Sequence, residues 1–539
     1  MSLFRRPLTE TASAPKITFR ERAAAWGKRG LKGFFLLLCA LATALLVKAS
    51  YPKVSVYGLG WVALAPFIMG VVHVRKFWRA FFYSWFSAVL IYGGLFWWIY
   101  RTCREGGDLS AGLSAAAWLG LSALIGLQFA VFGSSCFFLR KLRGLFPLMA
   151  ACGWVALEWL HQTLAFHVLG FPWVMLGYSQ WNFPPALQIA SLTGVYGVSF
   201  AVAFVGISVG FAFSGKVGFK GAVFQLILAT CMLGGVGGFG EWTLSRPAPK
   251  ALLSVSTAVM QPNIDQYKKW SPQFEAEIRS TLEDMGRQLK DKQALLAVWP
   301  ESAVPGELTQ EPYLSLFENI STQGSLFQVV GSNVTGDKQQ FVGAYVVSPF
   351  DDNLQEYRKV KLVPFGEYIP LESVVRSVAK DVAVLGELGS FTPGSPEQEL
   401  PQMSGVPFGI TVCYESIFPQ LWAKQNRAGA KFFVNVTNDA WFFDSDAPYQ
   451  HLAVSALRAV ETGRPVLRAA NTGISAVVDR YGRIQETAPL NTRAILTANI
   501  PLPLNEAQNF YTQWGDWFAW LCAALYFTLL ISAMVFAYE

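Results

Sequence analysis

Long apolar stretches separated by short polar loops fill the chain up to about residue 240, and one more closes it at the C-terminal end. A hydrocarbon core of about 30 Å takes roughly 20 helical residues to cross. We therefore predict eight membrane-spanning helices, seven before a long polar region and one after it. They cover Leu31–Ser50, Val54–Val72, Ala80–Tyr100, Leu109–Leu139, Leu145–Gln162, Leu192–Phe213, Gly221–Gly240 and Asp516–Tyr538.

The first apolar stretch also fits a second interpretation. It follows a basic segment, with Lys28 and Arg29 just before it, so a cleaved signal peptide is the alternative. Because seven further spans follow it, we favour an uncleaved first helix.

Between residues 241 and 515 the pattern changes to that of a soluble α/β domain. Short runs of Val, Ile, Phe and Ala have period-two stretches and end at Pro, Gly, Asn or Asp, as β-strands do. The runs are Ala251–Met260, Leu295–Trp299, Phe327–Val334, Phe341–Ser348, Phe408–Cys413, Phe432–Val436 and Ile474–Arg480. Helical patterns such as Ser271–Lys290 and Leu452–Thr462 lie between several of them, which favours sheets covered by helices. Asp381–Met403 is rich in Gly, Pro and Ser and is expected to be a loop.

Composition supports this division. Of the 539 residues, 53% are hydrophobic and only 15% are charged, whereas soluble proteins carry about 25% charge. This excludes a purely soluble protein and a disordered one, and seven cysteines are too few for a small disulfide scaffold. We expect a basic N-terminal segment (1–32), a membrane domain with seven helices (33–240), a soluble domain (241–515), and an eighth helix with the C-terminus (516–539).

The distribution of charge predicts the orientation in the membrane. The chain carries a net charge of +7, but acidic residues outnumber basic ones in 241–515, so the basic excess belongs to segments that flank the spans. A nucleic-acid partner is therefore not expected. If the N-terminus is cytoplasmic, sixteen Lys and Arg lie in inside segments and four in outside loops. This positive-inside bias places both termini in the cytoplasm and 241–515 on the outer face.

Cys413 is the one cysteine of the region 241–515, and it ends the β-rich run Phe408–Cys413. Compartments outside the cytoplasm usually pair their cysteines, so an unpaired one there needs an explanation. The ordinary explanation is a small buried apolar residue. Its polar neighbours Glu415 and Ser416 favour the other explanation, a thiol nucleophile.

A thiol nucleophile needs a base or a lowered pKa. His451 is the one histidine of this region, so a Cys–His pair stays open. Three residues could orient the imidazole of His451 in such a pair: Asn435, Asn438 and Asp439. Glu301 is a better-supported base, because it follows the run Leu295–Trp299 and the ends of strands face the clefts of α/β sheets. Lys359 can supply positive charge for an oxyanion. Each of these residues taken alone also fits an exposed loop position.

Three motifs together are far more specific than any single residue. They are Trp299-Pro-Glu-Ser302, Tyr357-x-Lys-x-x-Leu-Val-Pro-Phe-Gly-Glu367 and Val412-Cys-Tyr-Glu415, and the spacings from Glu301 to Lys359 and on to Cys413 are 58 and 54 residues. This combination resembles the Glu–Lys–Cys signature of the nitrilase superfamily and implies an αββα sandwich for 241–515. Seven spans before this domain and one after it narrow the resemblance to the apolipoprotein N-acyltransferase family. Two more runs are similar to that family: Gly170-Phe-Pro-Trp-x-x-x-Gly-Tyr-Ser-Gln180 and Thr437-Asn-Asp-Ala-Trp-Phe442.

The resemblance implies a role for each residue of the signature. Glu301 is the general base, Lys359 stabilises the oxyanion and Cys413 is the nucleophile. Lys361 lies two residues past Lys359, but the offset to the Leu-Val-Pro-Phe-Gly-Glu run selects Lys359.

Five supporting positions follow from the same resemblance. Glu367 and Glu415 match two further essential acidic residues of the family. Tyr414 matches the residue whose backbone N–H helps to hold the oxyanion. Trp270 and Trp441 match aromatic residues implicated in substrate access and in the shape of the acyl site. No metal and no cofactor is implied.

The family reaction moves an acyl chain, preferentially from the sn-1 position of phosphatidylethanolamine, to the α-amino group of a diacylglyceryl-cysteine at a lipoprotein's N-terminus. The resemblance thus implies a phospholipid donor, a diacylated apolipoprotein acceptor and a multi-pass protein of the bacterial inner membrane with a periplasmic catalytic domain. A monomer is expected. The rival interpretations are a membrane-tethered amidase and a non-catalytic accessory protein on the same scaffold.

One stretch departs from the family pattern. The fifth span ends in Glu158-Trp-Leu-His161, where an Arg is expected in place of His161, so a role in binding lipid phosphate is doubtful at that position. Glu158 fits either a functional intramembrane acid or an ordinary residue at the outer interface.

Overall fold

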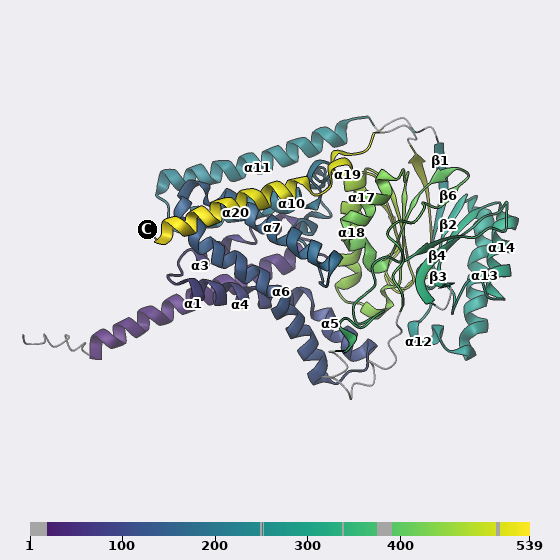
Figure 1. The fold of residues 1–539 in the computed structure, drawn as a ribbon, viewed down its shortest axis with the longest axis horizontal. Helices are drawn as coiled ribbons and strands as arrows, with labels where there is room; N and C mark the ends of the chain where they lie inside the picture. The colour runs from purple at the N-terminus through teal and green to yellow at the C-terminus, as the bar shows by residue number, and fades with distance from the viewer. Residues whose placement is uncertain are drawn as a thin grey trace, which may run out of the picture.

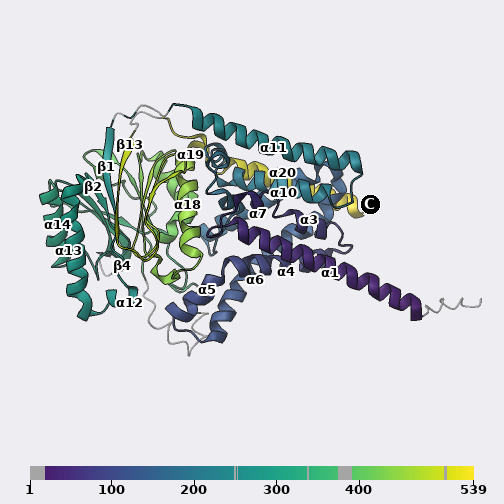
Figure 2. The same cartoon turned by 180° about the vertical axis from the view of Figure 1, so that it is seen from behind.

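The long helices and the strands separate into two parts in the computed structural model, which describes residues 19–247, 251, 253–336, 339–373, 391–502 and 507–538. A bundle of long helices forms one part, and a sandwich of two sheets with outer helices forms the other (Figure 1). The first and last long helices both point away from the sandwich at the far end of the bundle (Figure 2). The start of α1 and the end of α20 therefore lie on the same side of the helical part.

Seven long helices build the bundle in the described part of the chain. They are α1 (Phe19–Ser50), α4 (Phe77–Leu95), α6 (Ala111–Leu139), α7 (Phe146–His167), α10 (Val195–Ala212), α11 (Phe219–Ser245) and α20 (Trp517–Tyr538). Each coincides with one of the apolar stretches that were expected to cross the membrane. The helix α11 continues five residues past the expected end at Gly240.

Length and apolarity identify five helical runs among the described residues that can cross a membrane, or six when one bent pair counts as a span. The bent pair joins α4 to Trp97–Gly106 at 60°. The run Ala111–His167 has 57 residues, which as one helix would measure about 85 Å, far more than a hydrocarbon core. It breaks at Arg143, where φ is 46°, and α6 packs against α7, so we treat it as two helices.

The second expected span, Val54–Val72, is not a long helix. Its residues form two short helices, α2 (Tyr57–Gly60) and α3 (Ala65–Val71), within an apolar stretch of fewer than 18 residues. Pro66 stands in the first turn of α3. A proline is tolerated there, because the first N–H groups of a helix have no partner within it, but it would break the interior of a longer helix. A full set of eight long spans is therefore not confirmed, and eight crossings stay a prediction.

The helix α10 forms the centre of the bundle, with nearly all of its side chains buried. Its small residues let neighbouring helices approach closely. A Cβ atom on Gly210 would lie 2.5 Å from the carbonyl oxygen of Ala65 on α3. A side chain at this position would push the two helices apart.

The sandwich contains two sheets of mixed strand direction. One has the order β13 (Ala494–Leu502), β1 (Leu253–Gln261), β2 (Leu296–Val298), β3 (Phe327–Gly336), β4 (Gln339–Val347) and β5 (Gln355–Arg358). The other has the order β12 (Ile484–Thr487), β11 (Ala476–Val478), β10 (Val466–Ala470), β9 (Phe433–Thr437) and β8 (Gly409–Val412). The first sheet is covered by α13 (Glu275–Lys292) and α14 (Tyr313–Gly324), and the second by α17 (Pro419–Arg427) and α18 (Ala447–Thr462) (Figures 1 and 2).

Short elements connect these layers. They are α5 (Trp97–Arg101), η1 (Thr102–Gly106), η2 (Arg140–Leu145), η3 (Leu176–Gln180), α8 (Pro184–Leu187), α9 (Ala190–Thr193), α12 (Gln266–Lys269), η4 (Pro272–Phe274), β6 (Gln402–Met403), β7 (Val406–Pro407), η5 (Cys413–Ile417), η6 (Asp439–Phe442) and α19 (Phe510–Trp514).

Both faces of the first sheet are buried, and alternate residues of a strand serve different layers. On β1, Val255 and Val259 join the apolar core between the sheets. Ala258 and Met260 join the core under the outer helices. The four-layer αββα arrangement follows from this two-sided burial.

The layer of α17 and α18 lies between the second sheet and the helix bundle. One continuous apolar core contains Trp422 and Leu457 from these helices together with Val195 and Tyr196 from α10. The backbone N–H of Val195 also donates to the carboxylate of Glu461 on α18 (2.7 Å). The membrane helices are therefore packed directly against the helices that flank the second sheet.

The seven strands expected from the sequence are confirmed as β1, β2, β3, β4, β8, β9 and β11. Four strands that the pattern missed, β5, β10, β12 and β13, add to the sheets. The two expected helices are α13 and α18. Residues 381–390 of the expected loop lie outside the described residues, and 391–401 contain neither helix nor strand. Its last two residues form the short strand β6, so the expected end of the loop at Met403 was wrong by two residues.

Candidate active site

Glu301 and Lys359 meet where two strands of the first sheet end. Glu301 lies three residues past β2, and Lys359 follows β5 directly. The Glu301 Oε1 is 3.2 Å from the Lys359 Nζ, and both side chains are buried. The other carboxylate oxygen accepts a hydrogen bond from the backbone N–H of Asn438 (2.9 Å). Gly331 on β3 makes room for this arrangement, because a Cβ atom there would lie 2.6 Å from the Glu301 Cα.

Glu367 is a second carboxylate on the same ammonium group. Its Oε1 is 2.5 Å from the Lys359 Nζ, and its Oε2 accepts from the backbone N–H of Val363 (2.9 Å). Burial disfavours the charge of Lys359, but Glu301 and Glu367 outweigh it and raise the pKa of the ammonium. Burial raises the pKa of Glu367 even though Lys359 opposes this. Lys359 is thus held as a cation between two acids.

Cys413 begins the turn η5 directly after β8. Its φ of 50° is left-handed, a conformation that costs a residue with a side chain on the order of 1–3 kcal/mol and needs support from its surroundings. The residue is 8% exposed. Burial raises the pKa of its thiol, as does the charge of Glu301, while Lys359 lowers the pKa. Burial and Glu301 thus favour the neutral thiol, and Lys359 favours the thiolate.

Glu415 ties the turn of Cys413 to the strand of Lys359. Its Oε1 accepts from the backbone N–H groups of Val360 (2.5 Å) and Lys361 (3.1 Å), and its Oε2 accepts from that of Val412 (2.7 Å). Burial raises the pKa of this carboxyl to about 7, although the three N–H groups oppose the shift. A fully buried acid with these partners positions the backbone on both sides of the site.

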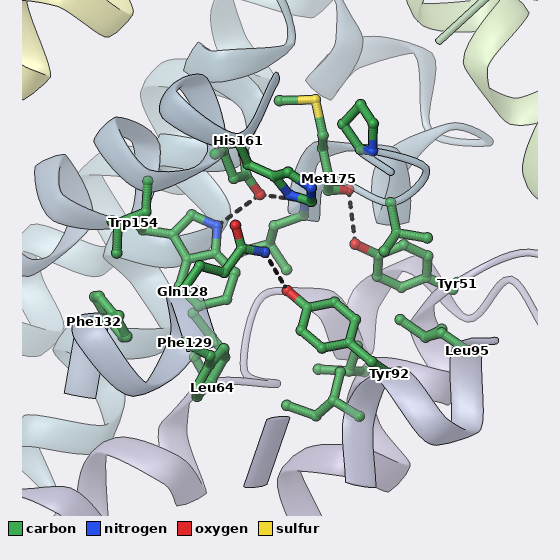
Figure 3. Close-up of a pocket in the computed structure, with 17 residues that line it drawn as sticks. Tyr51, Leu64, Tyr92, Leu95, Gln128, Phe129, Phe132, Trp154, His161 and Met175 are labelled. Carbon is green, nitrogen blue, oxygen red and sulfur yellow. Dashed lines mark hydrogen bonds between the residues drawn. The ribbon is translucent and has the colours of Figure 1, made fainter. Parts of the chain in front are cut away.

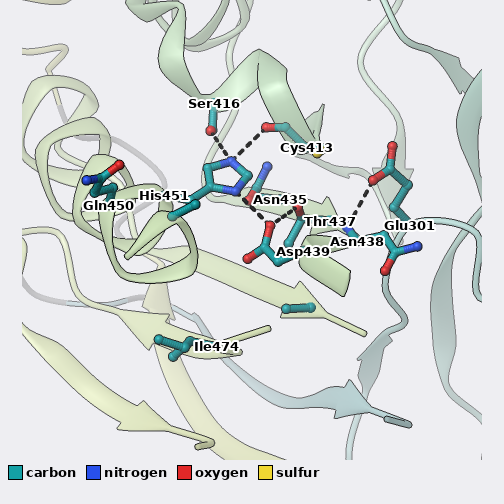
Figure 4. Close-up of polar contacts among 12 residues, drawn as sticks. Glu301, Cys413, Ser416, Asn435, Thr437, Asn438, Asp439, Gln450, His451 and Ile474 are labelled. Carbon is teal, nitrogen blue, oxygen red and sulfur yellow. Dashed lines mark hydrogen bonds and ion pairs between the residues drawn. The ribbon is translucent and has the colours of Figure 1, made fainter. Parts of the chain in front are cut away.

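His451 lies behind Cys413 and does not face the sulfur (Figure 4). Its Nε2 is 2.8 Å from the Ser416 Oγ and 3.1 Å from the carbonyl oxygen of Cys413. Its Nδ1 is 2.9 Å from the Asp439 Oδ1. Burial and the neighbouring Arg468 lower the pKa of His451. Because the two ring nitrogens contact other groups, the alternative of a Cys–His pair gains no support and Glu301 remains the better base.

Tyr414 connects the site to the membrane domain. Its hydroxyl donates to the carbonyl oxygen of Gly170 (3.1 Å), and its ring stacks with those of Phe171 and Trp173 at centroid distances of 6.1 and 6.5 Å. The run that includes Gly170, singled out from the sequence, therefore packs directly beside the residue that follows Cys413.

An apolar groove of about 270 Å³ opens beside Tyr414 at the junction of the two parts. Its walls come from the end of α7, the segment after Lys359 and the turn of Cys413. The lining residues are Ala165, Val168, Leu169, Gly170, Val360, Lys361, Leu362, Pro364, Tyr368, Phe391, Pro393, Tyr414 and Phe418. Lys361 is the charged residue of this lining. Its ammonium donates to the carbonyl oxygen of Phe166 and lies 4.3 Å from the centroid of that residue's ring.

Trp270 and Trp441 are half exposed, at 50% and 42%. Trp270 follows α12 and Trp441 lies on η6. The carbonyl oxygen of Trp441 accepts from the Thr102 hydroxyl on η1 (3.0 Å). Both indoles are thus available to a ligand, and their substrate roles stay predictions.

A second cavity lies inside the helix bundle (Figure 3). Most of its walls are apolar, but Glu158, His161, Gln128 and two tyrosines also line it. One Glu158 oxygen accepts from the Trp154 indole N–H (2.8 Å) and from a backbone N–H (2.7 Å). The helix α7 turns this acid into the bundle, and both interpretations of Glu158 stay predictions. The role of His161 stays open.

The structure gives Asn438 a contact that the sequence did not indicate, and it adds Lys269, which the sequence did not single out. The backbone N–H of Asn438 binds Glu301, and the fully buried Lys269 lies close to the same acid. Burial lowers the pKa of Lys269 to about 8, although the negative charge of Glu301 acts to raise it. Lys269 directly precedes Trp270, but a lysine in a polar loop gives no signal of burial. The backbone contact of Asn438 depends on tertiary packing alone.

The arrangement is suited to acyl transfer through sulfur. An acid that can take and return a proton stands near a thiol, and a fixed ammonium can stabilise the oxyanion formed when a carbonyl is attacked. Among the described residues, no group of three or more His, Cys, Asp and Glu side chains could hold a metal ion.

Two family profiles match the chain. The carbon-nitrogen hydrolase profile matches residues 256–509, and the profile of the apolipoprotein N-acyltransferase N-terminal domain matches residues 43–208. Together with the two packed sheets and their outer helices, the first match makes the sandwich a carbon-nitrogen hydrolase domain.

Curated relatives are similar over most of their length. An apolipoprotein N-acyltransferase of Geobacter metallireducens is 36% identical over 90% of this chain and 93% of its own. Those of Brucella melitensis and Methylococcus capsulatus are 32% and 34% identical, over 84% and 76% of this chain and the same shares of their own. A crystal structure of an amidase from Nesterenkonia sp. matches 48% of this chain and 92% of that one, at 20% identity and a TM-score of 0.35.

Proposed function

Because the chain belongs to the apolipoprotein N-acyltransferase family, we propose that Cys413 takes an acyl chain from a phospholipid and passes it to a lipoprotein. The chain is an acyltransferase of lipoprotein maturation, and its substrates are lipids and lipoproteins. The proposal adds the residues and steps. The observation that carries it is the buried contact of Glu301 with Lys359 next to the Cys413 thiol.

In the first half-reaction, Glu301 accepts the thiol proton as the Cys413 sulfur attacks the ester carbonyl of the donor. Lys359 and the backbone N–H of Tyr414 stabilise the resulting oxyanion. The carbon–oxygen ester bond then breaks, and Glu301 returns the proton to the departing alkoxide. A lysophospholipid leaves, and an acyl thioester remains on Cys413.

In the second half-reaction, the α-amino group of the diacylglyceryl-cysteine attacks the thioester. Glu301 accepts the proton that the amine loses and gives it to the departing sulfur, which restores the thiol. Each proton moves between groups within the site, so the buried net charge stays constant. The carboxylate of Glu301 also has a buried cation, Lys359, as its partner. A paired carboxylate suits a buried site better than an isolated one, because an unpaired buried charge is costly.

The groove beside Tyr414 supports a lipid donor. Its apolar walls run from the end of α7 to Val360 and Tyr414, the chain neighbours of Lys359 and Cys413. We propose that an acyl chain approaches the sulfur along this groove. We propose that sn-1 acyl chains of phosphatidylethanolamine enter here and that Lys361 faces the phosphate. Glu367 and Glu415 support Lys359 and the turn, and Trp270 and Trp441 border the acceptor's approach.

The chain is a bacterial membrane protein. We propose that it lies in the inner membrane as a monomer, with its catalytic domain (241–515) on the periplasmic face and both termini in the cytoplasm. The positive-inside bias of the loops supports this orientation. The start of α1 and the end of α20 lie on one side of the bundle, which is consistent with it (Figure 2).

The test is an acyl adduct on Cys413. Purified protein is incubated with phosphatidylethanolamine in detergent, and intact mass and peptide mapping follow the adduct and the lysophospholipid. We expect one acyl group on Cys413, none in Cys413→Ala, and transfer when a diacylated lipopeptide is added. Ammonia release from a small amide without a lipid adduct would instead favour the tethered amidase. Failure with every phospholipid, or an adduct that persists in Cys413→Ala, would refute the mechanism.

A further inference from the structure

Gln450 and His451 are neighbours on α18 that contact two different parts of the molecule (Figure 4). Gln450 binds tryptophans of the membrane domain, and His451 contacts the turn of Cys413. We propose that this pair positions the nucleophile and links its placement to the docking of the membrane helices. The inference rests on the proposed function. Both are positioning residues, because they act through Cys413 and not on substrate.

His451 holds the nucleophile turn at two points. Its Nε2 contacts the carbonyl oxygen of Cys413 (3.1 Å) and the Ser416 hydroxyl (2.8 Å), and both residues belong to η5. Its Nδ1 contacts Asp439 (2.9 Å). The ring is fully buried. With the proton on Nδ1 it donates to Asp439, and Nε2 accepts from the Ser416 hydroxyl; with the proton on Nε2 it donates to the turn, and Nδ1 accepts from the Arg468 guanidinium (3.1 Å). Each tautomer therefore keeps one bond on each side of the ring.

Asp439 is itself fixed by its neighbours. Its Oδ2 accepts from the Arg468 guanidinium (2.6 Å) and its Oδ1 from the Thr437 hydroxyl (3.0 Å). All of these side chains are buried: Thr437 and Asp439 lie at the carboxyl end of β9, and Arg468 lies in the middle of the neighbouring strand β10. A charge-assisted bond of this kind gives the imidazole a firm support.

The same segment also holds the base. Asn438, next to Asp439, donates its backbone N–H to Glu301 (2.9 Å). One stretch after β9 therefore sets the position of Glu301 directly and, through His451, that of Cys413. The distance between base and nucleophile is fixed by this common support.

The turn needs such support because Cys413 has a left-handed backbone. Glu415 holds the turn from the side of Lys359, and His451 holds it from the side of the Cys413 carbonyl group, away from the sulfur (Figure 4). Removing either contact leaves the turn with one of these two supports.

Gln450, the residue before His451, forms hydrogen bonds with the membrane domain. Its Oε1 accepts from the indole N–H groups of Trp98 (3.2 Å) and Trp173 (2.9 Å), and its Nε2 donates to the carbonyl oxygen of Leu95 (3.1 Å). The Trp173 ring centroid is 5.1 Å from that of His451. A shift of α5 or of the segment around Trp173 is therefore transmitted to the nucleophile turn.

The first experiment separates positioning from folding by measuring both the amount and the rate constant of acyl-enzyme formation. In His451→Ala, we expect the rate constant to fall roughly 10- to 100-fold, the cost of a misplaced nucleophile, with full acylation at long times and an unchanged KM for the donor. His451→Gln, whose amide reaches toward the Nε2 position, should recover part of the rate. Asn426→Ala removes another buried hydrogen-bonding group, on α17, and should leave the rate constant unchanged. A wild-type rate constant with reduced amplitude in His451→Ala would overturn the inference.

The second experiment tests the link to the membrane domain without any lipid. Iodoacetamide alkylates Cys413, and peptide mass follows the rate. Gln450→Met, Trp98→Phe and Trp173→Phe should change this rate several-fold. Trp85→Phe removes an indole N–H that bonds the carbonyl oxygen of Ala123 within the bundle, and should not change it.

Wild-type alkylation rates in the Gln450, Trp98 and Trp173 variants would overturn the link. A wild-type protein that never forms an acyl adduct would refute the proposed function, yet the alkylation rates would still decide the positioning role of the pair.

Discussion

Replacing Lys359 with Met removes the cation that lies between two buried carboxylates. Its Nζ is 3.2 Å from the Glu301 Oε1 and 2.5 Å from the Glu367 Oε1. Removing one partner of a buried ion pair costs about 3–5 kcal/mol, because the other charge is left unpaired. Here both acids lose the same partner, so we expect a loss of stability of at least that size at neutral pH. The rate of acyl-enzyme formation should fall by about 10²- to 10³-fold, as for the loss of one oxyanion donor.

The loss of stability should depend on pH. Burial and Glu301 already raise the pKa of Glu367, and Lys359 counteracts them. Without Lys359 the folded-state pKa rises further above the unfolded value. A group of this kind favours the folded state at low pH, and that contribution is lost as pH rises through the folded pKa. The gap in Tm between wild type and Lys359→Met should therefore narrow when the pH falls from 8 to 5.

The assay measures Tm in detergent at several pH values together with acylation of Cys413. Combining Lys359→Met with Glu367→Gln removes one of the two acids, so Tm should recover in part while acylation stays low. Lys424→Met serves as the control, because its pair with Glu397 is exposed and such changes stay within about 0.5 kcal/mol. A double variant no more stable than Lys359→Met, or a gap in Tm that does not change with pH, would refute the reasoning.

Three further predictions test other parts of the site. Lys361→Met should slow acylation of Cys413 by phosphatidylethanolamine about tenfold, which corresponds to the loss of roughly one charge-assisted hydrogen bond to the phosphate. Acylation by a p-nitrophenyl ester, which lacks phosphate, should keep its rate. Equal slowing with both donors would contradict this prediction. Arg468 and His451 outweigh the effect of burial and lower the pKa of Asp439 to about 2, so its carboxylate stabilises the folded state above about pH 4. The Tm of Asp439→Asn should therefore lie below that of the wild type at neutral pH, and this difference should shrink as the pH falls below 4. A difference in Tm that stays constant with pH would contradict the prediction. Gly331→Ala should cut the acylation rate at least tenfold by displacing Glu301, unlike Gly112→Ala, which meets open space; an unchanged rate would show that the strand gives way.

The pattern of apolar and polar residues along the chain was enough to predict much of the architecture. Apolar runs of spanning length and period-two strands are properties of neighbouring residues, so most long helices and seven strands were predictable. The exceptions have local causes that a count of apolar residues does not register. Pro66 starts a new helix inside an expected span, and the short strand β10 looks like part of the helical run before it.

The sequence by itself singled out Glu301, Lys359 and Cys413 as the proposed catalytic residues, because they stand in three motifs with a characteristic spacing. Only the tertiary structure decided what surrounds them. His451 could be read as a base, but the packing of α18 turns its ring toward the backbone of Cys413 and not the sulfur. Contacts of this kind join residues far apart in the chain, and their geometry follows from how the layers pack.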